Sequence, residues 1–600
     1  MPERETSKEL KLGRRLLEDI VGYERLNDFI WDDNINQWHL IARLTIDTVQ
    51  SDLVPPSTEW HIFVDDEYPR GSINFFPDAD KGIKYTFHHQ NYNRLREGIK
   101  WRDGKVCLDT TQGSWGRKRY STEPFHARTR LRWHVERCLM WLVAAATDTL
   151  AEVGDPFELP DYPDATSFRF VFNEDNHSFE KWQNREERSG LFTYCGLGHQ
   201  SETYPITSFF PPWEDNSDNF WGKYIQEKGQ KQKTGAWIML SDIPIIKPWQ
   251  MASNFKELSN VCLDQGIDLF NTILRAYTKL QRKRLVLNVV ILGFPVSSSI
   301  GGTKELIHWF AFEVPRAPKV TGFRDNETLW KRQVSILLSP NNIINWIKTE
   351  NWNEAQLTSR GRVDQGLRDS RILFIGAGAL SATFSEVFGR LGCKNLTIID
   401  FDKFHAGNLS RHTLTVKDVG KNKAEALSRH LNSLFPFQRV DFRNMSINTI
   451  FSKQHGFLDD FDVVIDATAE DEVIELLSNQ PSPKNSHFFS VSTGYNAERL
   501  YCYMRPGSET NNLKDDFERR MATWLQKESE TARGESEIIE GIGCWHPLFP
   551  ARIDDIQMLV GAAFKVIEKH FLTGAGTQLS VVEKKYDDRG DFAGIGINND

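Results

Sequence analysis

The chain has 600 residues and a formal net charge of −9; 40% of its residues are hydrophobic and 12% are aromatic. This length exceeds what one hydrophobic core usually serves, so about two to four domains are expected, and the aromatic content argues against extensive disorder. The negative charge disfavours nucleic acid as a general partner.

Neither a membrane span nor a secretion signal is expected. The longest apolar run, residues 140–146, is far shorter than the roughly 20 residues that cross a bilayer, and residues 1–8 lack the apolar segment of a signal peptide. The 7 cysteines include no CxxC pair, which indicates a reducing compartment and argues against a structural zinc site. We therefore expect a cytoplasmic protein.

The first unit predicted from the sequence is an α+β domain over residues 1–163. Apolar residues at 10, 12, 16, 17 and 20 are spaced as one helical face, and those at 38, 40, 41, 44 and 49 as a second. Strands are predicted at 60–64, 72–76 and 83–87, followed by a long helix over 125–152. Prolines at 156, 160 and 163 end this unit.

Residues 164–350 are interpreted as a mixed α/β connecting domain without a chemical signature. Strands are predicted at 168–172, 285–291 and 308–313, with a helix near 257–281.

Strands and helices alternate in the third predicted unit, residues 351–600. Strands are expected at 371–375, 395–399, 439–443 and 462–466, and helices at 379–391 and 421–434. This alternation predicts a doubly wound, Rossmann-like parallel sheet, so the chain as a whole belongs to the α/β class.

Two glycines follow the first strand of this third unit. Gly376 permits a tight turn and Gly378 a close approach of phosphate, where backbone N–H groups and a helix N-terminus face an anion. Asp400 ends the next strand, where a carboxylate can hold ribose hydroxyls. An NAD oxidoreductase, or a strand-turn-helix without a ligand, would share these features.

The residues that follow Asp400 help to distinguish between these kinds of protein. Asn408, Arg411 and Lys423 add an amide and two cations, which suit attack by a carboxylate at the α-phosphorus of a triphosphate because charge develops on the phosphate oxygens. Residues 365–470, and more loosely those to about 570, resemble the ubiquitin-activating and ThiF/MoeB adenylating family.

The resemblance implies ATP as substrate and a role for each of these side chains. It places Asp400 at the ribose, Arg411 and Lys423 at the phosphates, and Asn408 at the nucleotide. We count Asp402 among the nucleotide-binding residues, and Arg411 and Lys423 also as catalytic.

Mg²⁺ is expected with ATP, since the metal neutralises phosphate charge. The family places its magnesium-binding aspartate shortly after the strand that ends at Asp466, at a position that Ala469 occupies here. Asp466 is therefore the leading candidate for the metal ligand, with Glu470 and Asp471 as alternatives.

Cys544 is the first candidate nucleophile. It lies in Gly543-Cys-Trp-His546-Pro547, where glycines before the cysteine and a proline after it imply a loop. His546 could favour the thiolate, which is the nucleophilic form. The position is similar to the family's crossover segment, which brings a cysteine to the adenylate; a packed structural cysteine is the alternative.

Cys107 is the second candidate. It follows Gly104 after a series of strands, a context that suggests an exposed shelf. Residues 35–160 resemble ubiquitin-conjugating enzymes in the order of several short motifs. That fold uses a His-Pro-Asn element whose asparagine supports the oxyanion, and the matching positions are His89, Gln90 and Asn91. A structural role for Cys107 is the alternative.

An adenylating and a conjugating domain on one chain resemble the fused enzymes of bacterial CBASS anti-phage operons. The resemblance implies that a protein C-terminus, that of a cGAS-like nucleotidyltransferase, is adenylated, captured by Cys544, passed to Cys107 and conjugated to an amine. The fusion of the two domains favours the transfer from Cys544 to Cys107, because it raises the local concentration of the second thiol. Since only one Rossmann signature is present and the family is two-lobed, a homodimer is expected.

Two rival functions stay open at this point. One is an adenylating enzyme for a small sulfur-carrier or ubiquitin-like protein, with a non-catalytic N-terminal binding module. The other is a scaffold that binds nucleotide and a partner without chemistry.

Overall fold

The computed structural model describes residues 4–46, 51–108, 123–162, 167–198, 201–211, 221–228, 232–323, 325–481, 483, 485–532, 539–540, 546–547 and 551–600, and no side chain between 531 and 550. The chain divides into two compact units. The first comprises Met1–Tyr194, Gln200–Trp213 and Gln232–Asn351, and the second Cys195–His199, Glu214–Lys231 and Trp352–Asp600. None of the helices in the described part is long and apolar enough to cross a membrane.

The N-terminal part of the first unit is an antiparallel sheet packed against helices. The sheet has the order β1-β3-β4-β5, and β2 also pairs with β3. Its elements are α1 (Lys8–Arg15), β1 (Tyr23–Arg25), β2 (Ile30–Asp32), β3 (Gln37–Thr45), β4 (Ser57–Val64), β5 (Ile73–Pro77) and α2 (Arg130–Ala146). One face of the sheet buries apolar side chains that form a single cluster with those of α2.

The second helix expected before residue 50 is wrong, because residues 37–45 form β3. Trp38, Leu40, Ala42 and Leu44 are buried at every second position, which is the period of a strand. Residues 83–87, expected as a strand, form none.

The remainder of the first unit contains a closed barrel of seven strands, in the order β12-β13-β14-β6-β8-β7-β9. The strands are β6 (Arg169–Phe172), β7 (Ser189–Tyr194), β8 (Thr203–Phe210), β9 (Lys233–Met239), β12 (Val289–Val296), β13 (Leu306–Glu313) and β14 (Trp346–Asn351). The other elements are α3 (Asn176–Gln183), β10 (Ile245–Ile246), β11 (Gln250–Met251), α5 (Phe255–Asp264), α6 (Leu269–Arg282) and α7 (Asn326–Leu337). The single helix expected near 257–281 is divided into α5 and α6 at Gly266, whose φ of 75° favours glycine.

Helix α3 contributes Trp182 to an aromatic cluster with three strands of the barrel. Trp182 packs against Phe209, Trp237 and Trp309, which come from three different strands. Glu174 is buried beneath them and accepts hydrogen bonds from the indole N–H groups of Trp182, at 3.1 Å, and Trp309, at 2.8 Å. Burial raises the pKa of the Glu174 carboxyl to about 7.

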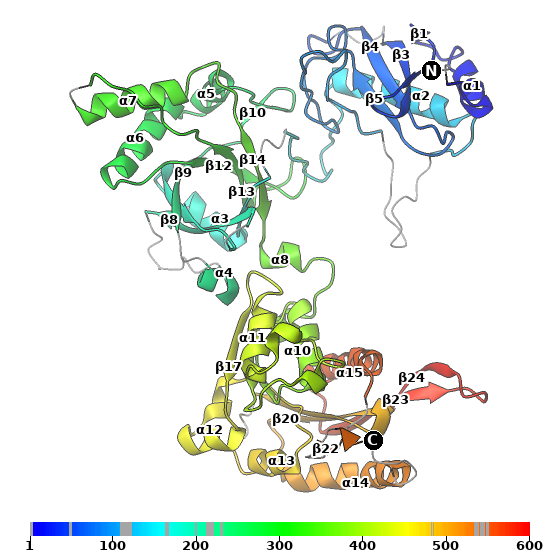
Figure 1. Cartoon of the computed structure of the whole chain (residues 1–600), viewed down its shortest axis with the longest axis vertical. Helices are drawn as coiled ribbons and strands as arrows, with labels where there is room; N and C mark the ends of the chain where they lie inside the picture. Colours follow the sequence, from blue (N-terminus) through cyan, green and yellow to red (C-terminus); the bar gives the residue numbers. More distant parts are fainter. Residues whose placement is uncertain are drawn as a thin grey trace. The chain divides into compact units, whose positions relative to one another are not determined.

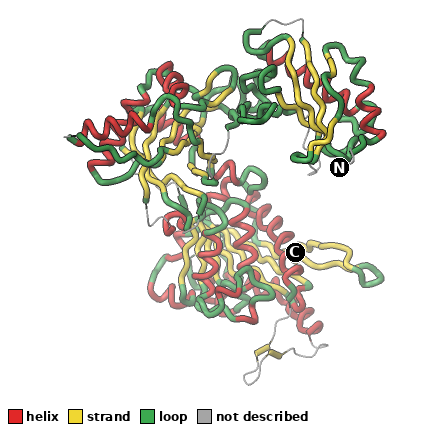
Figure 2. The backbone as a smooth tube through the Cα atoms, turned by 45° about the horizontal axis from the view of Figure 1, so that its top comes forward, coloured by secondary structure: helices red, strands yellow, loops and turns green. Residues whose placement is uncertain are grey.

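The second unit is built on an eight-stranded sheet of the order β17-β16-β15-β18-β19-β20-β23-β24. Strands β17 to β19 in this order are parallel and the last three are antiparallel. The strands are β15 (Arg371–Ile375), β16 (Asn395–Ile399), β17 (Arg439–Arg443), β18 (Val463–Asp466), β19 (His487–Thr493), β20 (Arg499–Pro506), β23 (Gln578–Tyr586) and β24 (Phe592–Asn599). Residues 578–583 of β23 pair with β20, and the far end of the hairpin of β23 and β24 extends away from the other elements of this unit (Figure 2).

Helices cover both faces of this sheet (Figure 1). Ile372 and Phe374 of β15 face a cluster with α10, α11 and α15, whereas Leu373 and Ile375 face a cluster with α12 and α13. The helices are α8 (Glu354–Leu357), α9 (Gln365–Asp369), α10 (Ala379–Arg390), α11 (Lys423–Asn432), α12 (Ile447–Lys453), α13 (Asp471–Ser478), α14 (Leu513–Ala532) and α15 (Ile553–Thr573), with a small ladder of β21 (Ile539–Glu540) and β22 (His546–Pro547). The predicted α/β class with a doubly wound C-terminal sheet is confirmed.

One segment of the second unit comes from between two barrel strands. Helix α4 (Lys223–Lys228) lies in sequence between β8 and β9, yet it packs at the start of the edge strand β17. The Gly222 N–H donates to the Pro436 carbonyl at 2.6 Å and the Lys223 N–H to the Gln438 carbonyl at 3.0 Å. A Cβ atom at position 222 would lie 2.2 Å from the Gln438 oxygen, so this approach requires glycine.

Candidate functional site

The loop between β15 and α10 forms the centre of the candidate site. Gly376 has a φ of 90°, and its N–H donates to the Ile399 carbonyl at 2.8 Å. Gly378 is the N-cap of α10, where no side chain caps the first amides, and a Cβ atom at position 378 would meet nothing within 4 Å. The loop therefore presents open space in front of a helix N-terminus, which is an arrangement that fits an anion.

Asp400 braces this loop from the end of β16. Its carboxylate accepts the Ala377 N–H and the Asp402 N–H, each at 2.7 Å. Burial raises the pKa of Asp400, and the two backbone hydrogen bonds oppose that effect because they favour the charged form. Asp402 is exposed and pairs with the Lys423 ammonium at 2.9 Å.

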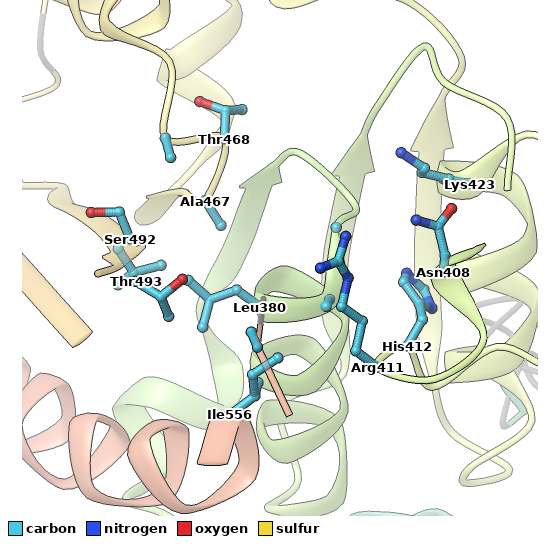
Figure 3. A pocket seen from close by; sticks show the side chains of 15 residues that line it. Leu380, Asn408, Arg411, His412, Lys423, Ala467, Thr468, Ser492, Thr493 and Ile556 are labelled. Carbon is cyan, nitrogen blue, oxygen red and sulfur yellow. The ribbon is translucent and has the colours of Figure 1, made fainter. Parts of the chain in front are cut away.

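Two cavities adjoin the loop at the carboxyl ends of the strands. The larger, of about 470 Å³, is lined by Gly376, Asp400 and Asp402, and the other, of about 330 Å³, by Asn408 and Arg411. Both are lined by Gly378, Lys423, Ala467 and Thr468. In the second cavity Asn408, Arg411 and Lys423 lie on one side and Thr468 and Ser492 on the other (Figure 3). Seven of the predicted nucleotide-binding residues thus line one continuous region, whereas their individual roles stay predictions.

His412 also contributes to this region, and sequence reasoning missed it. Its ring Nε2 lies 3.0 Å from the Ala377 carbonyl, and its Nδ1 accepts the Leu414 N–H at 3.1 Å. The Nδ1 lone pair is used, so the neutral ring carries its proton on Nε2 and donates it to Ala377. Burial lowers the pKa of His412 to about 4. Its place directly after Arg411 was the only signal in the sequence.

Asp466, the predicted metal ligand, is buried and hydrogen-bonded within the protein. Its Oδ1 accepts from the Thr468 hydroxyl at 2.7 Å and its Oδ2 from the Ser490 hydroxyl at 2.9 Å, while burial raises its pKa. Ala469 follows in the left-handed region, with a φ of 57°. Glu470 is exposed and lines the larger cavity.

A third cavity, of about 330 Å³, continues from the second past Ala469, Ser492 and Thr493, which line both. Phe517 and Met521 of α14 contribute to its largely apolar wall. The second and third cavities therefore share part of their lining.

Cys107 lies in the first unit and is exposed, as expected from its sequence context. Its N–H donates to the His89 carbonyl at 2.7 Å, which joins the segment around the cysteine to the one that contains Asn91. Gly104 is required nearby, because a Cβ atom there would lie 2.3 Å from the Asn93 amide oxygen.

Among the described cysteines, the other five are buried, and burial raises the pKa of each thiol; they are Cys138, Cys195, Cys262, Cys393 and Cys502. Cys544 lies outside the described residues.

The second unit contains a domain of the ThiF type. The ThiF family model matches residues 353–496, and the model of the Cap2 central linker domain matches residues 148–352. The molybdopterin-synthase adenylyltransferase of Escherichia coli (strain K12) is 30% identical to this chain over 17% of the chain and 41% of that protein.

A longer match gives the family. The ATP-dependent ubiquitin transferase-like protein Cap2 of Enterobacter hormaechei subsp. hoffmannii (strain UCI 50) is 32% identical over 88% of this chain and 89% of that protein. The Cap2 of Pseudomonas aeruginosa (strain BWHPSA011 / Pa011) is 30% identical over 18% and 19%, respectively. The chain belongs to the Cap2 family of ATP-dependent ubiquitin transferase-like proteins, which confirms the resemblance to fused activating and conjugating enzymes.

Proposed function

We propose that this protein uses ATP to activate the C-terminus of a partner protein and conjugates it to an amine through two successive thioesters. The observation that carries the proposal is the exposed thiol of Cys107 on a chain that also has the open glycine loop at Gly378. Partner and setting follow the family resemblance: a cGAS-like nucleotidyltransferase, in anti-phage defence. A cytoplasmic homodimer belongs to the same proposal.

The residues around the glycine loop fit a nucleoside triphosphate. Asp400 would hold the ribose, while Arg411, Lys423 and Asn408 would face the phosphates, where they stabilise the charge that develops at the α-phosphorus. Mg²⁺ would neutralise phosphate charge. We place its protein ligand at Glu470 rather than Asp466, because Glu470 is exposed in the larger cavity whereas Asp466 is buried.

The chemistry then proceeds in four displacements. The partner's carboxylate attacks the α-phosphorus of ATP and pyrophosphate leaves. The Cys544 thiolate attacks the acyl carbon and AMP leaves, and the Cys107 thiolate then displaces Cys544. An amine finally displaces Cys107 and forms an amide.

Non-reducing gels after incubation with ATP and the nucleotidyltransferase test the order of the thioesters. We expect Cys107→Ala to accumulate the adduct on Cys544, and Cys544→Ala to form no adduct. Loading of Cys107 in the Cys544→Ala variant would overturn the order, and loss of the first adduct in Cys107→Ala would overturn the assignment of roles.

The similarity to molybdopterin-synthase adenylyltransferase favours one alternative, an enzyme that adenylates a small sulfur-carrier or ubiquitin-like protein. That alternative gives Cys107 no chemical role, so Cys107→Ser would retain full activity. Under our proposal the same substitution abolishes conjugation and leaves partner-dependent ATP–pyrophosphate exchange intact.

A further inference from the structure

His89 lies across from Cys107 on two paired chain segments. Besides the bond from the Cys107 N–H to the His89 carbonyl at 2.7 Å, the Asn91 N–H donates to the Lys105 carbonyl at 2.9 Å. Gln90 and Val106, which form the bridge between these bonds, are buried, whereas His89 and Cys107 are exposed. His89 and Cys107 therefore flank the buried pair on the two joined segments, and both side chains are exposed there.

The conformation of His89 is unusual and is held by one carboxylate. Its φ is 57°, in the left-handed region that side chains other than glycine seldom adopt. Glu158 Oε2 accepts the His89 backbone N–H at 3.2 Å and lies 3.1 Å from the ring Nδ1. Strained backbone of this kind persists where surrounding contacts enforce it, and it clusters at active sites.

The contact with Glu158 determines which ring nitrogen is available. A neutral ring with its proton on Nδ1 donates to Glu158 and keeps the lone pair on Nε2. No partner for Nε2 is found among the residues that the structure describes. A base that a carboxylate orients is one element of a catalytic triad, and the backbone bond of 2.7 Å brings His89 next to the segment that carries the nucleophile.

The side chain of Asn91 is not available to Cys107 in the same way. Its side-chain amide donates to Asp161 Oδ2 at 2.9 Å, and Asp161 also accepts the Tyr92 N–H at 3.0 Å. The amide of Asn91 is thereby directed toward Asp161.

We propose that His89 is the proton acceptor for the amine that attacks the Cys107 thioester, and that Glu158 is the residue that positions it. This inference rests on the proposed function. A lysine amine with a pKa near 10.4 is an ammonium ion at neutral pH and must lose a proton before it attacks. That proton goes to Nε2 of His89, the nitrogen bonds to the acyl carbon, the carbon–sulfur bond breaks, and the thiolate takes the second proton of the nitrogen as the amide forms.

The experiment loads Cys107 without ATP. The full-length Cys544→Ala chain is incubated with a synthetic peptide thioester of mercaptoethanesulfonate, which exchanges its acyl group onto Cys107 and releases the small thiol. Excess thioester is removed, and discharge is followed by intact-mass spectrometry with either free L-lysine or hydroxylamine as acceptor. Hydroxylamine is already uncharged at neutral pH and needs no base.

His89→Asn is the informative variant, because asparagine tolerates the left-handed backbone but is not a base. We expect it to load at the wild-type rate, to lose about 100-fold in discharge to lysine, and to discharge to hydroxylamine within about twofold of wild type. Glu158→Gln should lose about tenfold with lysine alone, since it acts through His89. His177→Gln, an exposed histidine on α3, is the matched control and should change neither rate.

Each remaining outcome decides the matter differently. Unchanged discharge of His89→Asn to lysine overturns the inference and leaves the relay intact. An equal loss with both acceptors also overturns it, because it indicates a structural role. If the parent chain is not acylated at Cys107 at all, the proposed function fails together with the inference.

Discussion

Acid should loosen the glycine loop between β15 and α10 through His412. The ring is neutral in the folded protein, where it donates to the Ala377 carbonyl and accepts from Leu414. Its pKa falls from 6.5 to about 4 on folding, so between these values the unfolded chain binds more protons than the folded one. The stabilisation is complete above pH 6.5 and is lost as the pH falls through about 4.

The size of the effect follows from the two pKa values. The whole difference corresponds to about 3 kcal/mol, and the part lost by pH 5.5 to a factor of about ten in an opening equilibrium. His412→Gln supplies the comparison, because an amide can still donate to the Ala377 carbonyl but does not titrate in this range.

Hydrogen exchange of the peptide covering residues 371–390, in wild type and variant at matched pH, measures the loop directly. The two proteins share the same intrinsic exchange rates, so the ratio of their protection factors isolates the side chain. We expect the protection factor of the wild type, divided by that of His412→Gln, to fall about tenfold between pH 7 and pH 5.5. A ratio that is the same at both pH values would refute the assignment of a neutral, buried His412.

Three further predictions concern other parts of the chain. Gly376→Ala should destabilise the second unit by about 1–2 kcal/mol in thermal unfolding, because the φ of 90° at this position disfavours a side chain. Gly378→Ala should unfold as the wild type does but lose nucleotide binding, measured by calorimetry with ATP. Equal losses of stability in the two variants would contradict this distinction. Glu174 has a folded pKa of about 7, above its usual 4.5, so the stability that its protonated form contributes is complete below pH 4.5 and is lost as the pH rises through 7. The free energy of unfolding of Glu174→Gln should therefore rise by about 3 kcal/mol relative to wild type from pH 4.5 to pH 8, with unfolding followed by the fluorescence of Trp182 and Trp309. A difference between the two proteins that does not change with pH would exclude a titrating carboxyl. Arg411→Ala should lower partner-dependent ATP–pyrophosphate exchange by about 100-fold with unchanged unfolding, and retention of exchange would remove Arg411 from the phosphate site.

The sequence predicted the second unit best, since its parallel strands are short buried apolar runs that each lead to a helix or a glycine. It failed at residues 37–45, where Ile41 completed an apparent helical spacing although the strand pattern of Trp38, Leu40 and Leu44 decides the structure. A single periodic window is consistent with both elements, and pairing with β4 over eight residues selects the strand.

The residues of the candidate site were predictable where they come from one contiguous motif. They were not predictable where the site depends on contacts between residues far apart in the sequence. Gly378, Arg411 and Lys423 follow from one stretch of chain. Glu158 meets His89 from 69 residues away, and no local pattern indicates such a contact. The same holds for the contact of Asp466 with the Ser490 hydroxyl, which comes from 24 residues away.

Helix α4 has a practical consequence for dissecting this protein. A fragment that starts at Trp352 would contain every strand of the C-terminal sheet, yet it would lack Trp221 and Ile225, which are buried in the intact chain, and the backbone donors that meet residues 436–438. Such a truncation removes α4 from the edge strand β17, and an uncovered edge strand favours self-association. The second unit therefore includes a segment of the loop that joins two barrel strands, and a truncated fragment should keep that segment, for instance by grafting residues 221–228 onto it.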